Sequence, residues 1–355
     1  MDLKQLEYII KIAEENNITR AAEKLFITQS ALNQQLLRLE KELGTPLFYR
    51  SRTNWRPTEA GKVYLENARK ILQIKHQTYS IISDIAATRK GNLSVGFTPG
   101  RGIDMFAAVY PAFHRQYPNI IVEPKEMSVH QQQQQISQGN LDIGFMTLRE
   151  CDQTGDIYEI IAKEEFVLAI PEGHPLGRQA APAGEPLTTI DLSPLKYEPF
   201  VFMYKESTSR RLTDSIFRHA AFSPVVLFET SSTSAIATLV RSCICCGVIP
   251  YYYVKKDPTG IAAFSLPERP SWNLAVSYKK GGYVSRAARE FIRLASEYWS
   301  GSPLLSPSST EDPANSSGGS QEQKKRLPHP DLPITDAAAS RFIPGCSHIY
   351  LKYHI

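Results

Sequence analysis

Apolar residues in the first 45 positions recur at three- and four-residue steps, which is the spacing of amphipathic helices. The pattern predicts three short helices around one small core, with the second over 19–26 and the third over 29–43. The positions predicted to face that core are Leu3, Leu6, Ile9, Ile10, Ala13, Ala21, Ala22, Leu25, Phe26, Ala31, Leu32, Leu36, Leu39 and Leu43. Thr28 is suited to cap the third helix and Gly44 to end it. Because only about three residues join the second and third helices, they suggest a helix-turn-helix.

A basic segment follows the third helix. Leu47 and Phe48 are apolar anchors, and the next charged residues are all arginines. These are Arg50, Arg52 and Arg56. The segment fits a short basic hairpin or wing.

One long helix is predicted from Thr58 to about Thr88. Its apolar stripe consists of Tyr64, Ala68, Ile71, Leu72, Tyr79, Ile82, Ile85 and Ala86. A helix of roughly 30 residues spans on the order of 45 Å, which is too long for the small domain before it to cover. Since an uncovered apolar stripe usually packs on a second copy, we interpret this helix as a dimerisation helix.

From residue 91 onward, short apolar runs alternate with helical stretches. The strand-like runs are 93–97, 120–124, 141–146, 165–170, 200–203, 225–230, 247–250 and 274–278. Helix candidates lie at 102–117, 130–139, 208–220, 232–244 and 284–299. This alternation predicts α/β architecture with mostly parallel sheets. We expect two lobes, with a small-ligand site in the cleft between them.

Residues 301–355 have a different composition. Of these 55 residues, 20 are Pro, Gly or Ser, and KKR is their one run of charge. Because no hydrophobic period is sustained, we predict a disordered tail. The sequence does not indicate what this tail does.

Charge and cysteine usage narrow the class of protein. Residues 1–90 hold 15 Lys and Arg against 10 Asp and Glu, whereas the rest of the chain holds 25 against 26. A positive excess at one end suggests a polyanionic partner there. No stretch approaches the roughly 18 uncharged apolar residues of a membrane helix, and the N-terminus lacks the apolar core of a secretory signal. Five cysteines in so long a chain do not make a disulfide framework, so we expect a cytoplasmic protein with no membrane partner.

The N-terminal segment resembles the DNA-binding domain of LysR-type transcriptional regulators. The matching positions are Ala21-Ala22, Thr28-Gln29 with Ala31, Leu39-Glu40, Leu43-Gly44, Leu47-Phe48, Arg50, and Thr58 with Ala60-Gly61. Later segments resemble the effector domain of that family: VGFTPG, QGNLDIGFM, GHPL at 173–176 and GVIP at 247–250. The likeness covers about residues 1–300, and the tail has no recognised counterpart.

The resemblance implies an α+β multidomain protein. It would have a winged helix-turn-helix over 1–58, a linker and dimerisation helix over 59–89 and a periplasmic-binding-protein-like effector domain over 90–300. Lobe I of that domain would comprise about 91–163 and 267–300, and lobe II about 164–266. The implied partners are double-stranded DNA, a small-molecule effector, further copies in a homodimer or homotetramer, and RNA polymerase.

The third helix carries the candidate base-reading residues on its polar face. The candidates for DNA binding are Thr28, Gln29, Ser30, Asn33, Gln34 and Arg38, with Arg50, Arg52 and Arg56 in the wing. Gln and Asn can bond a base edge at two atoms, whereas wing arginines suit phosphate or the minor groove. The family often has Ser at the position of Asn33 and Arg at that of Gln34, so this sequence departs there. A solvated helix face is the simpler alternative.

Hydroxyl groups follow several of the predicted strands. By resemblance, the effector-binding candidates are Thr98, Gly100, Arg101, Ser128, Thr147, Tyr204, Thr230, Ser231 and Ser232. Free N–H groups where Thr98-Pro99-Gly100 enters a helix suit an anion, so a small organic anion is one candidate effector. The alternative is that these Ser and Thr residues only cap helices.

Other chemistry finds little support in the sequence. Cys243, Cys245 and Cys246 stand where the family commonly has Gly at two places, and buried packing explains them better than a metal site. No GxSxG, HExxH or P-loop motif occurs, so we expect neither an enzyme nor a cofactor or metal.

The leading hypothesis is a ligand-responsive regulator. The alternatives are a two-lobed solute-binding protein or enzyme with an accessory DNA-binding domain, and a DNA packer without a ligand. The effector, the operator and the direction of regulation stay open.

Overall fold

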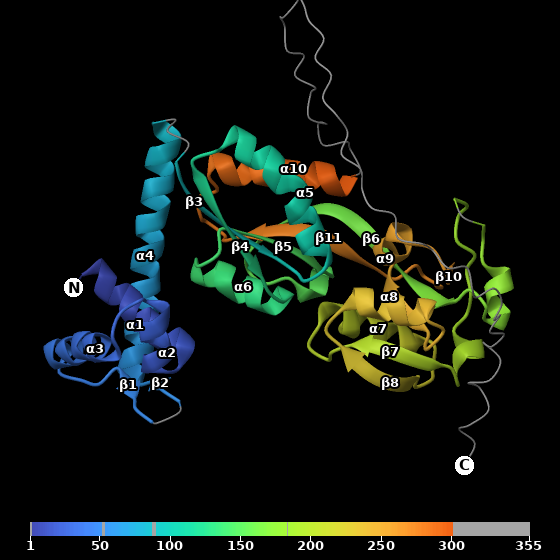
Figure 1. Cartoon of the computed structure of the whole chain (residues 1–355), viewed down its shortest axis with the longest axis horizontal. Helices are drawn as coiled ribbons and strands as arrows, with labels where there is room; N and C mark the ends of the chain where they lie inside the picture. Colours follow the sequence, from blue (N-terminus) through green and yellow to red (C-terminus); the bar gives the residue numbers. More distant parts are fainter. Residues whose placement is uncertain (1, 52–53, 87–89, 183, 301–355) are drawn as a thin grey trace, which may run out of the picture. The chain divides into compact units, whose positions relative to one another are not determined.

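The computed structural model describes residues 2–300 apart from 52–53, 87–89 and 183 (Figure 1). The predicted tail at 301–355 and the wing residue Arg52 therefore lie outside the described residues. In the part of the chain that is described, no helix has both the length and the apolar character needed to cross a membrane.

The N-terminal helices are α1 (Leu3–Glu15), α2 (Ile18–Lys24) and α3 (Gln29–Leu43). The Asn17 side chain caps α2 by accepting from two backbone N–H groups, and Thr28 caps α3 by accepting from Ala31 N at 3.2 Å. Gly44 ends α3 in the left-handed conformation, as predicted. Leu6, Ile9, Leu32, Leu36 and Leu39 form the centre of one hydrophobic core.

Phe26 is not a core residue, contrary to the prediction. It is 96% exposed, because it follows the C-cap of α2 with a left-handed backbone (φ 55°) that turns its side chain away from the stripe of that helix. The N–H of Phe26 donates to Glu23 O and that of Ile27 to Ala22 O, which is the Schellman pattern. Glycine is the usual residue at this position because it has no Cβ to strain. Leu3, Ala31 and Leu43 are likewise exposed rather than buried.

A two-stranded wing connects α3 to the long helix. Strands β1 (Phe48–Tyr49) and β2 (Arg56–Pro57) pair antiparallel. The helix α4 (Glu59–Ile85) is capped by Thr58, whose hydroxyl also donates to Pro46 O at 2.8 Å. Gly61 faces the wing so closely that a Cβ would lie 2.0 Å from Leu47 O. The first turns of α4 are thus fixed to the small domain.

The rest of the chain forms one large mixed sheet and one small sheet. The strands are β3 (Gly91–Phe97), β4 (Ile120–Glu126), β5 (Ile143–Leu148), β6 (Ile157–Pro171), β7 (Pro199–Met203), β8 (Val225–Thr230), β9 (Gly247–Pro250), β10 (Ile261–Ser265) and β11 (Ser271–Tyr278). The large sheet has the order β10-β6-β11-β5-β3-β4, with β9 paired to β6, and β7 pairs with β8 separately.

The expectation of mostly parallel sheets is wrong for this region. Only β3 with β4, β3 with β5, and β7 with β8 are parallel, whereas β11 and β6 form antiparallel pairs with all their partners. The reason is that β6 runs from lobe I into lobe II, and β11, which follows the lobe II strand β10, runs back beside the lobe I part of β6. The Ile157–Glu165 part of β6 pairs with β11, and its Phe166–Pro171 part pairs with β10 and β9.

Helices cover this framework in two groups, which we call lobe I and lobe II. Lobe I contains α5 (Arg101–Gln116), α6 (Val129–Gln138) and α10 (Arg286–Ser300), with α5 and α10 on one face of the sheet and α6 on the other (Figure 1). Lobe II contains α7 (Thr208–His219), α8 (Thr233–Arg241) and α9 (Tyr251–Lys256). Phe113, Phe145 and Phe291 centre the core of lobe I, whereas Phe200 and Phe217 belong to that of lobe II.

We expect Phe26→Gly to stabilise the N-terminal domain by about 1 kcal/mol, because glycine relieves the left-handed backbone strain of a residue with a Cβ. The urea dependence of amide hydrogen exchange in α1–α3 measures this free energy of unfolding locally. Gly61→Ala is the opposite control, since its Cβ would collide with Leu47 O. Unchanged or lower protection in Phe26→Gly would contradict the expectation.

Candidate functional site

The outer face of α3 carries the polar side chains predicted to read bases. Thr28, Gln29, Ser30, Gln34 and Arg38 are exposed, and Asn33 is half-buried. The Thr28 hydroxyl accepts from Ala31 N as the cap of α3 and also lies 3.1 Å from the Ser30 hydroxyl, so these two contacts already use part of its hydrogen-bonding capacity. Ala31 and Leu37 are exposed on the same helix and add apolar surface to this face. Amide, hydroxyl and methyl groups together can contact both polar base edges and thymine methyl groups.

The wing arginines differ in their surroundings. Arg50 forms an ion pair with the buried Glu40 and lies over the Trp55 ring at 5.6 Å. Glu40 also accepts from Leu47 N at 2.8 Å, so Arg50 helps to hold the wing against α3. Arg56 is exposed on β2. Of the two described arginines, Arg56 is therefore the one whose charge is available to a phosphate.

A cavity of about 400 Å³ lies where lobes I and II meet. The predicted effector residues that line it are Thr98, Gly100, Arg101, Ser128, Thr147, Tyr204, Ser231 and Ser232. Thr230 is not part of the lining, and its hydroxyl instead accepts from Ser232 N at 3.2 Å. The strand-end positions chosen from the sequence are thus brought together.

Four helices begin at the edge of this cavity, two from each lobe. Gly100, Ser128, Ser207 and Ser232 are the N-caps of α5, α6, α7 and α8 in that order. The Ser128, Ser207 and Ser232 hydroxyls each accept from a backbone N–H of their own helix, so all three cap their helices as well as lining the cavity. Helix N-termini carry partial positive charge and free N–H groups, so four of them favour an anion in the cavity.

The sequence analysis missed Ser207, Thr208 and Ser209, which also line the cavity. They open the helix after the strand at 200–203, so the rule that selected Thr98 and Ser128 selects them too. Thr208 Oγ1 donates to the Thr147 carbonyl at 3.0 Å and so joins α7 of lobe II to β5 of lobe I. The Arg211 guanidinium lies 3.4 Å from Asp152 and makes a second contact between the lobes.

Arg101 has a partner within the protein. It is largely buried and forms an ion pair with Glu164 of β6, while its guanidinium stacks on the Tyr252 ring at 4.3 Å. Glu164 also accepts from Trp272 Nε1 at 2.8 Å and from Tyr252 N at 3.1 Å. The positive charge of Arg101 is therefore compensated within the protein, and the Glu126 and Glu206 side chains also line the cavity.

The cysteine cluster is consistent with packing. Cys245 and Cys246 are buried, and burial raises the pKa of both thiols, that of Cys245 to about 11. A raised pKa keeps a thiol protonated and unreactive at neutral pH. Among the described residues, no group of three or more His, Cys, Asp or Glu side chains could hold a metal ion.

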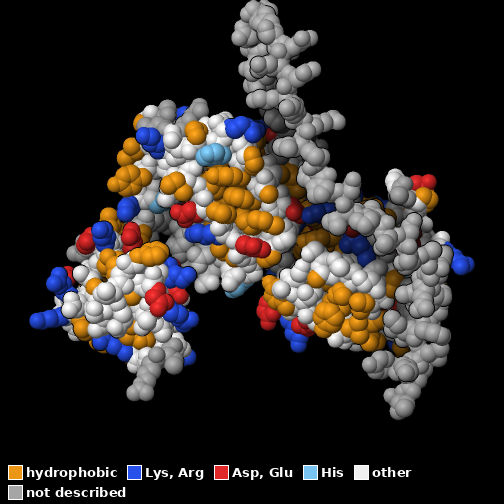
Figure 2. Space-filling model, in the orientation of Figure 1, with side chains coloured by type: hydrophobic (Ala, Val, Ile, Leu, Met, Phe, Trp, Pro, Cys, Tyr) orange, Lys and Arg blue, Asp and Glu red, His pale blue; other side chains and the backbone are white. Residues whose placement is uncertain are grey.

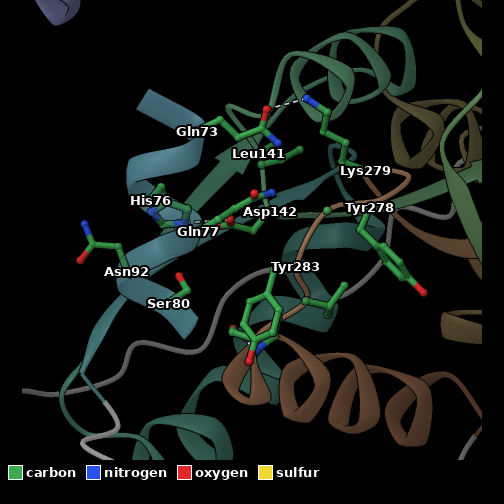
Figure 3. Close-up of a pocket in the computed structure, with 15 residues that line it drawn as sticks. Gln73, His76, Gln77, Ser80, Asn92, Leu141, Asp142, Tyr278, Lys279 and Tyr283 are labelled. Carbon is green, nitrogen blue, oxygen red and sulfur yellow. Dashed lines mark hydrogen bonds and ion pairs between the residues drawn. The ribbon is translucent and has the colours of Figure 1, made fainter. Parts of the chain in front are cut away.

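The long helix α4 contacts lobe I through polar side chains (Figure 3). His76 Nε2 lies 2.9 Å from Asp142, and Gln73 accepts from Lys279 at 2.5 Å. Near the end of α4, Asp84 accepts from the Tyr283 hydroxyl at 2.7 Å and from Arg286 N at 2.8 Å. These bonds connect the helix that starts at the wing to the β5 edge and to α10.

The His76–Asp142 pair is tuned by its surroundings. The hydrogen bond to Asp142 raises the pKa of His76 against the opposing effect of burial. Burial would raise the pKa of Asp142, but hydrogen bonds from His76 and Ser94 outweigh it and hold the pKa below its ordinary range. Ser94 donates to Asp142 from both its N–H and its hydroxyl, at 2.8 and 2.7 Å. Asp142 is thus an anion that both β3 and α4 bind.

Comparison with known proteins gives consistent matches over the whole described part. Residues 3–62 match the family described as bacterial regulatory helix-turn-helix protein, lysR family, and residues 86–300 match the LysR substrate binding domain. The uncharacterized HTH-type transcriptional regulator YwbI of Bacillus subtilis is 28% identical over 303 residues, which is 84% of this chain and 97% of that protein. The Hca operon transcriptional activator HcaR of Escherichia coli is 26% identical, over 84% of this chain and 98% of its own.

Solved structures share the fold. A full-length OxyR variant from Pseudomonas aeruginosa superposes with a TM-score of 0.60 at 23% identity, over 84% of this chain and 97% of that one. CbnR, a LysR family transcriptional regulator, has a TM-score of 0.54 at 22% identity, over 83% of this chain and 98% of that one.

We expect the His76 imidazole to titrate above its ordinary value of 6.5 in NMR spectra of the folded protein, and Asp142→Asn to lower that midpoint. Because the folded pKa is raised, the pair stabilises the α4–lobe I contact fully below about pH 6.5, and this stabilisation is lost as pH rises through the folded pKa of His76. At acid pH the pair is lost when Asp142 is protonated. Because the folded pKa of Asp142 lies below the ordinary value of 3.8, this loss of stabilisation occurs only below about pH 3.8. A His76 midpoint at or below 6.5 would contradict the pairing.

Proposed function

Because the chain belongs to the LysR family of bacterial transcriptional regulators, we propose that it binds double-stranded DNA through α3 and the wing, and that a small organic anion between the lobes alters this binding. The observation that carries the proposal is the cavity of about 400 Å³ at which four helices begin, in the same chain as an exposed helix-turn-helix face. Members of this family are transcriptional regulators rather than enzymes, which removes the enzyme alternative.

We assign three functional segments. Residues 1–58 bind DNA, 59–89 link and dimerise, and 90–300 bind the effector. The support is that α4 begins directly after the wing at Glu59 and that the family match to the ligand-binding part starts at residue 86. The proposed lobe boundaries near 164 and 267 are supported by β6, which pairs with β11 up to Glu165 and with β10 beyond it, and by the segment between β10 and β11.

On DNA, α3 enters the major groove with its N-terminal residues toward the bases. Gln29 and Gln34 are suited to bidentate bonds with adenine, and Ser30 to either base or phosphate. Arg56 neutralises phosphate from the wing, and Arg38 does so from the far end of the α3 face. Arg50 supports the wing through Glu40, so we assign it a positioning role instead of a DNA contact.

The effector is proposed to be a small carboxylate or other anion. The N-termini of α5, α6, α7 and α8 supply positive potential from both lobes, so one anion bridging them draws the lobes together. Thr98, Thr147 and Tyr204 line the same cavity and can bond the neutral part of the molecule. An effector shifts the protein only by its differential affinity for two arrangements of the lobes.

The signal is proposed to reach DNA through α4. Lobe I contacts this helix at Gln73, His76 and Asp84, and the N-terminal turns of the same helix pack on the core of α1–α3. A shift of lobe I therefore moves α4, a single continuous helix that begins directly after the wing. Lys75 of α4 and Glu7 of α1 add an ion pair of 3.6 Å on the way.

We further propose that the regulator is a homo-oligomer. The first half of the α4 stripe packs on its own domain through Tyr64, Ala68 and Ile71, whereas the second half is exposed. The exposed large apolar residues of α4 are Val63, Ile74, Tyr79, Ile81, Ile82 and Ile85.

The edge strand β8 exposes Val225, Val226, Leu227 and Phe228, and Figure 2 shows hydrophobic side chains gathered over this part of lobe II. Two separate apolar surfaces suit a dimer or a dimer of dimers.

Footprinting on the DNA beside the gene, at fixed salt, tests the proposal. We expect protection of two half-sites related by a two-fold axis, because a symmetric dimer presents two α3 helices. A panel of small carboxylic acids, amino acids and sugar phosphates is then added, and one of them is expected to change the footprint. Protection of a single half-site would argue against the dimer, and no specific protection at any salt would refute the regulator.

Two variants separate base reading from backbone contact. Gln29→Ala should relax preference at one base position by about tenfold, because it removes a bidentate bond. Arg56→Ala should weaken binding to all sequences and reduce the salt slope by roughly one counterion, because it removes a phosphate contact. Binding titrations on matched and scrambled sites at several salt concentrations measure both. Equal losses for both variants on every sequence would contradict this division of roles.

A further inference from the structure

Phe26 combines two unfavourable features in one residue. Its phenyl group is 96% exposed, more than any other large hydrophobic side chain in the described part of the chain. Its backbone occupies the left-handed region (φ 55°), at the C′ position of a Schellman motif where glycine is the least strained residue. Packing within the chain explains neither feature, because the helix-turn-helix core is formed by its neighbours Ala22 and Leu32.

The place of Phe26 in the fold indicates what the ring meets. It lies in the turn between α2 and α3, two residues before Thr28, the N-cap of α3. Phe26 and Gln29 are three residues apart and so at most about 11 Å from each other along the chain, which is about three base-pair steps. The last turn of α2, which precedes this turn, exposes Lys24 and Glu23. Because the turn leads directly into α3, whose outer face is polar, DNA is favoured over an apolar protein surface as the partner of the ring.

We propose that Phe26 packs against a thymine 5-methyl group at the edge of the α3 contact and so adds a preference for thymine at that position. This inference rests on the proposed DNA-binding function. A phenyl ring has no charge and no hydrogen-bonding group, so it gains little from phosphate, whereas the thymine methyl is an apolar group exposed in the major groove. Ala31, in the first turn of α3, is exposed as well.

The test couples one protein change to single-atom changes in DNA. On a site that the wild-type protein footprints, each thymine is replaced in turn by deoxyuridine, which lacks only the methyl group. We expect one replacement within about three base pairs of the Gln29 contact to weaken wild-type binding several-fold. The same replacement should leave the affinity of Phe26→Gly unchanged, while Phe26→Gly itself binds the unmodified site about tenfold more weakly, because part of a phenyl group is no longer buried.

Matched controls separate this role from a structural one. Phe26→Gly should bind DNA more weakly although its N-terminal domain resists unfolding better, a combination that a purely structural residue does not give. Phe26→Leu keeps an apolar contact and should retain part of the thymine preference. Tyr197→Ala removes another strongly exposed aromatic ring, from lobe II, and should leave DNA affinity unchanged.

The outcomes distinguish the inference from the function beneath it. If the wild-type protein binds no specific DNA, the proposed function fails. If it binds and Phe26→Gly binds equally well, the inference is overturned while the function stands. Weaker binding by Phe26→Gly without coupling to any thymine overturns the thymine assignment in favour of the sugar–phosphate backbone. A change in sedimentation coefficient with unchanged DNA affinity places the ring against another copy of the chain and overturns the inference as well.

Discussion

The antiparallel pairing of β6 and β11 is the constraint on which the ligand cavity depends. The strand β6 passes from lobe I to lobe II, and β11 returns beside the lobe I part of β6, so this ladder sets where the two lobes join. Glu164 lies at this passage and binds Arg101 of α5, Tyr252 of α9 and Trp272 of β11. A buried carboxylate is stable there only while its donors stay in place, because an unpaired buried charge is costly. The N-termini of helices from two lobes therefore meet around one cavity.

The cavity and the DNA-binding face are joined by one helix, and the nature of its contacts differs along its length. Near the wing, α4 is held by close packing at Gly61 and by apolar side chains in the core. Toward lobe I it is held by polar contacts at Gln73, His76 and Asp84. Packed cores resist sliding, whereas a few hydrogen bonds can exchange at low cost. The lobes therefore act on α4 through polar contacts, whereas α4 and the wing are joined by close packing.

At Phe26, the proposed contact with DNA lowers the stability of the small N-terminal domain. A glycine would suit the turn conformation, and a polar residue would suit its exposure. Local rules are broken most often where a residue serves an external partner. The same holds in part for Ala31 and Leu37, which lie on the outer face of α3. Arg50 shows the reverse case, since a residue that looks free in the sequence is held by Glu40.

The sequence by itself determined the features that depend on near neighbours. Helical periodicity, the caps at Thr28 and Gly44, and the hydroxyl groups at strand ends all follow from residues within a few positions of each other. They were enough to predict the helix-turn-helix, the long helix and eight of the residues that line the cavity. Only the tertiary structure decided the direction of β6 and β11, the pairing of Arg101 with Glu164 across 63 residues, and the exposure of Phe26. The physical reason is that strand direction, ion pairing and burial depend on groups that folding brings together from distant parts of the chain. The periodicity of a short segment does not identify those distant partners.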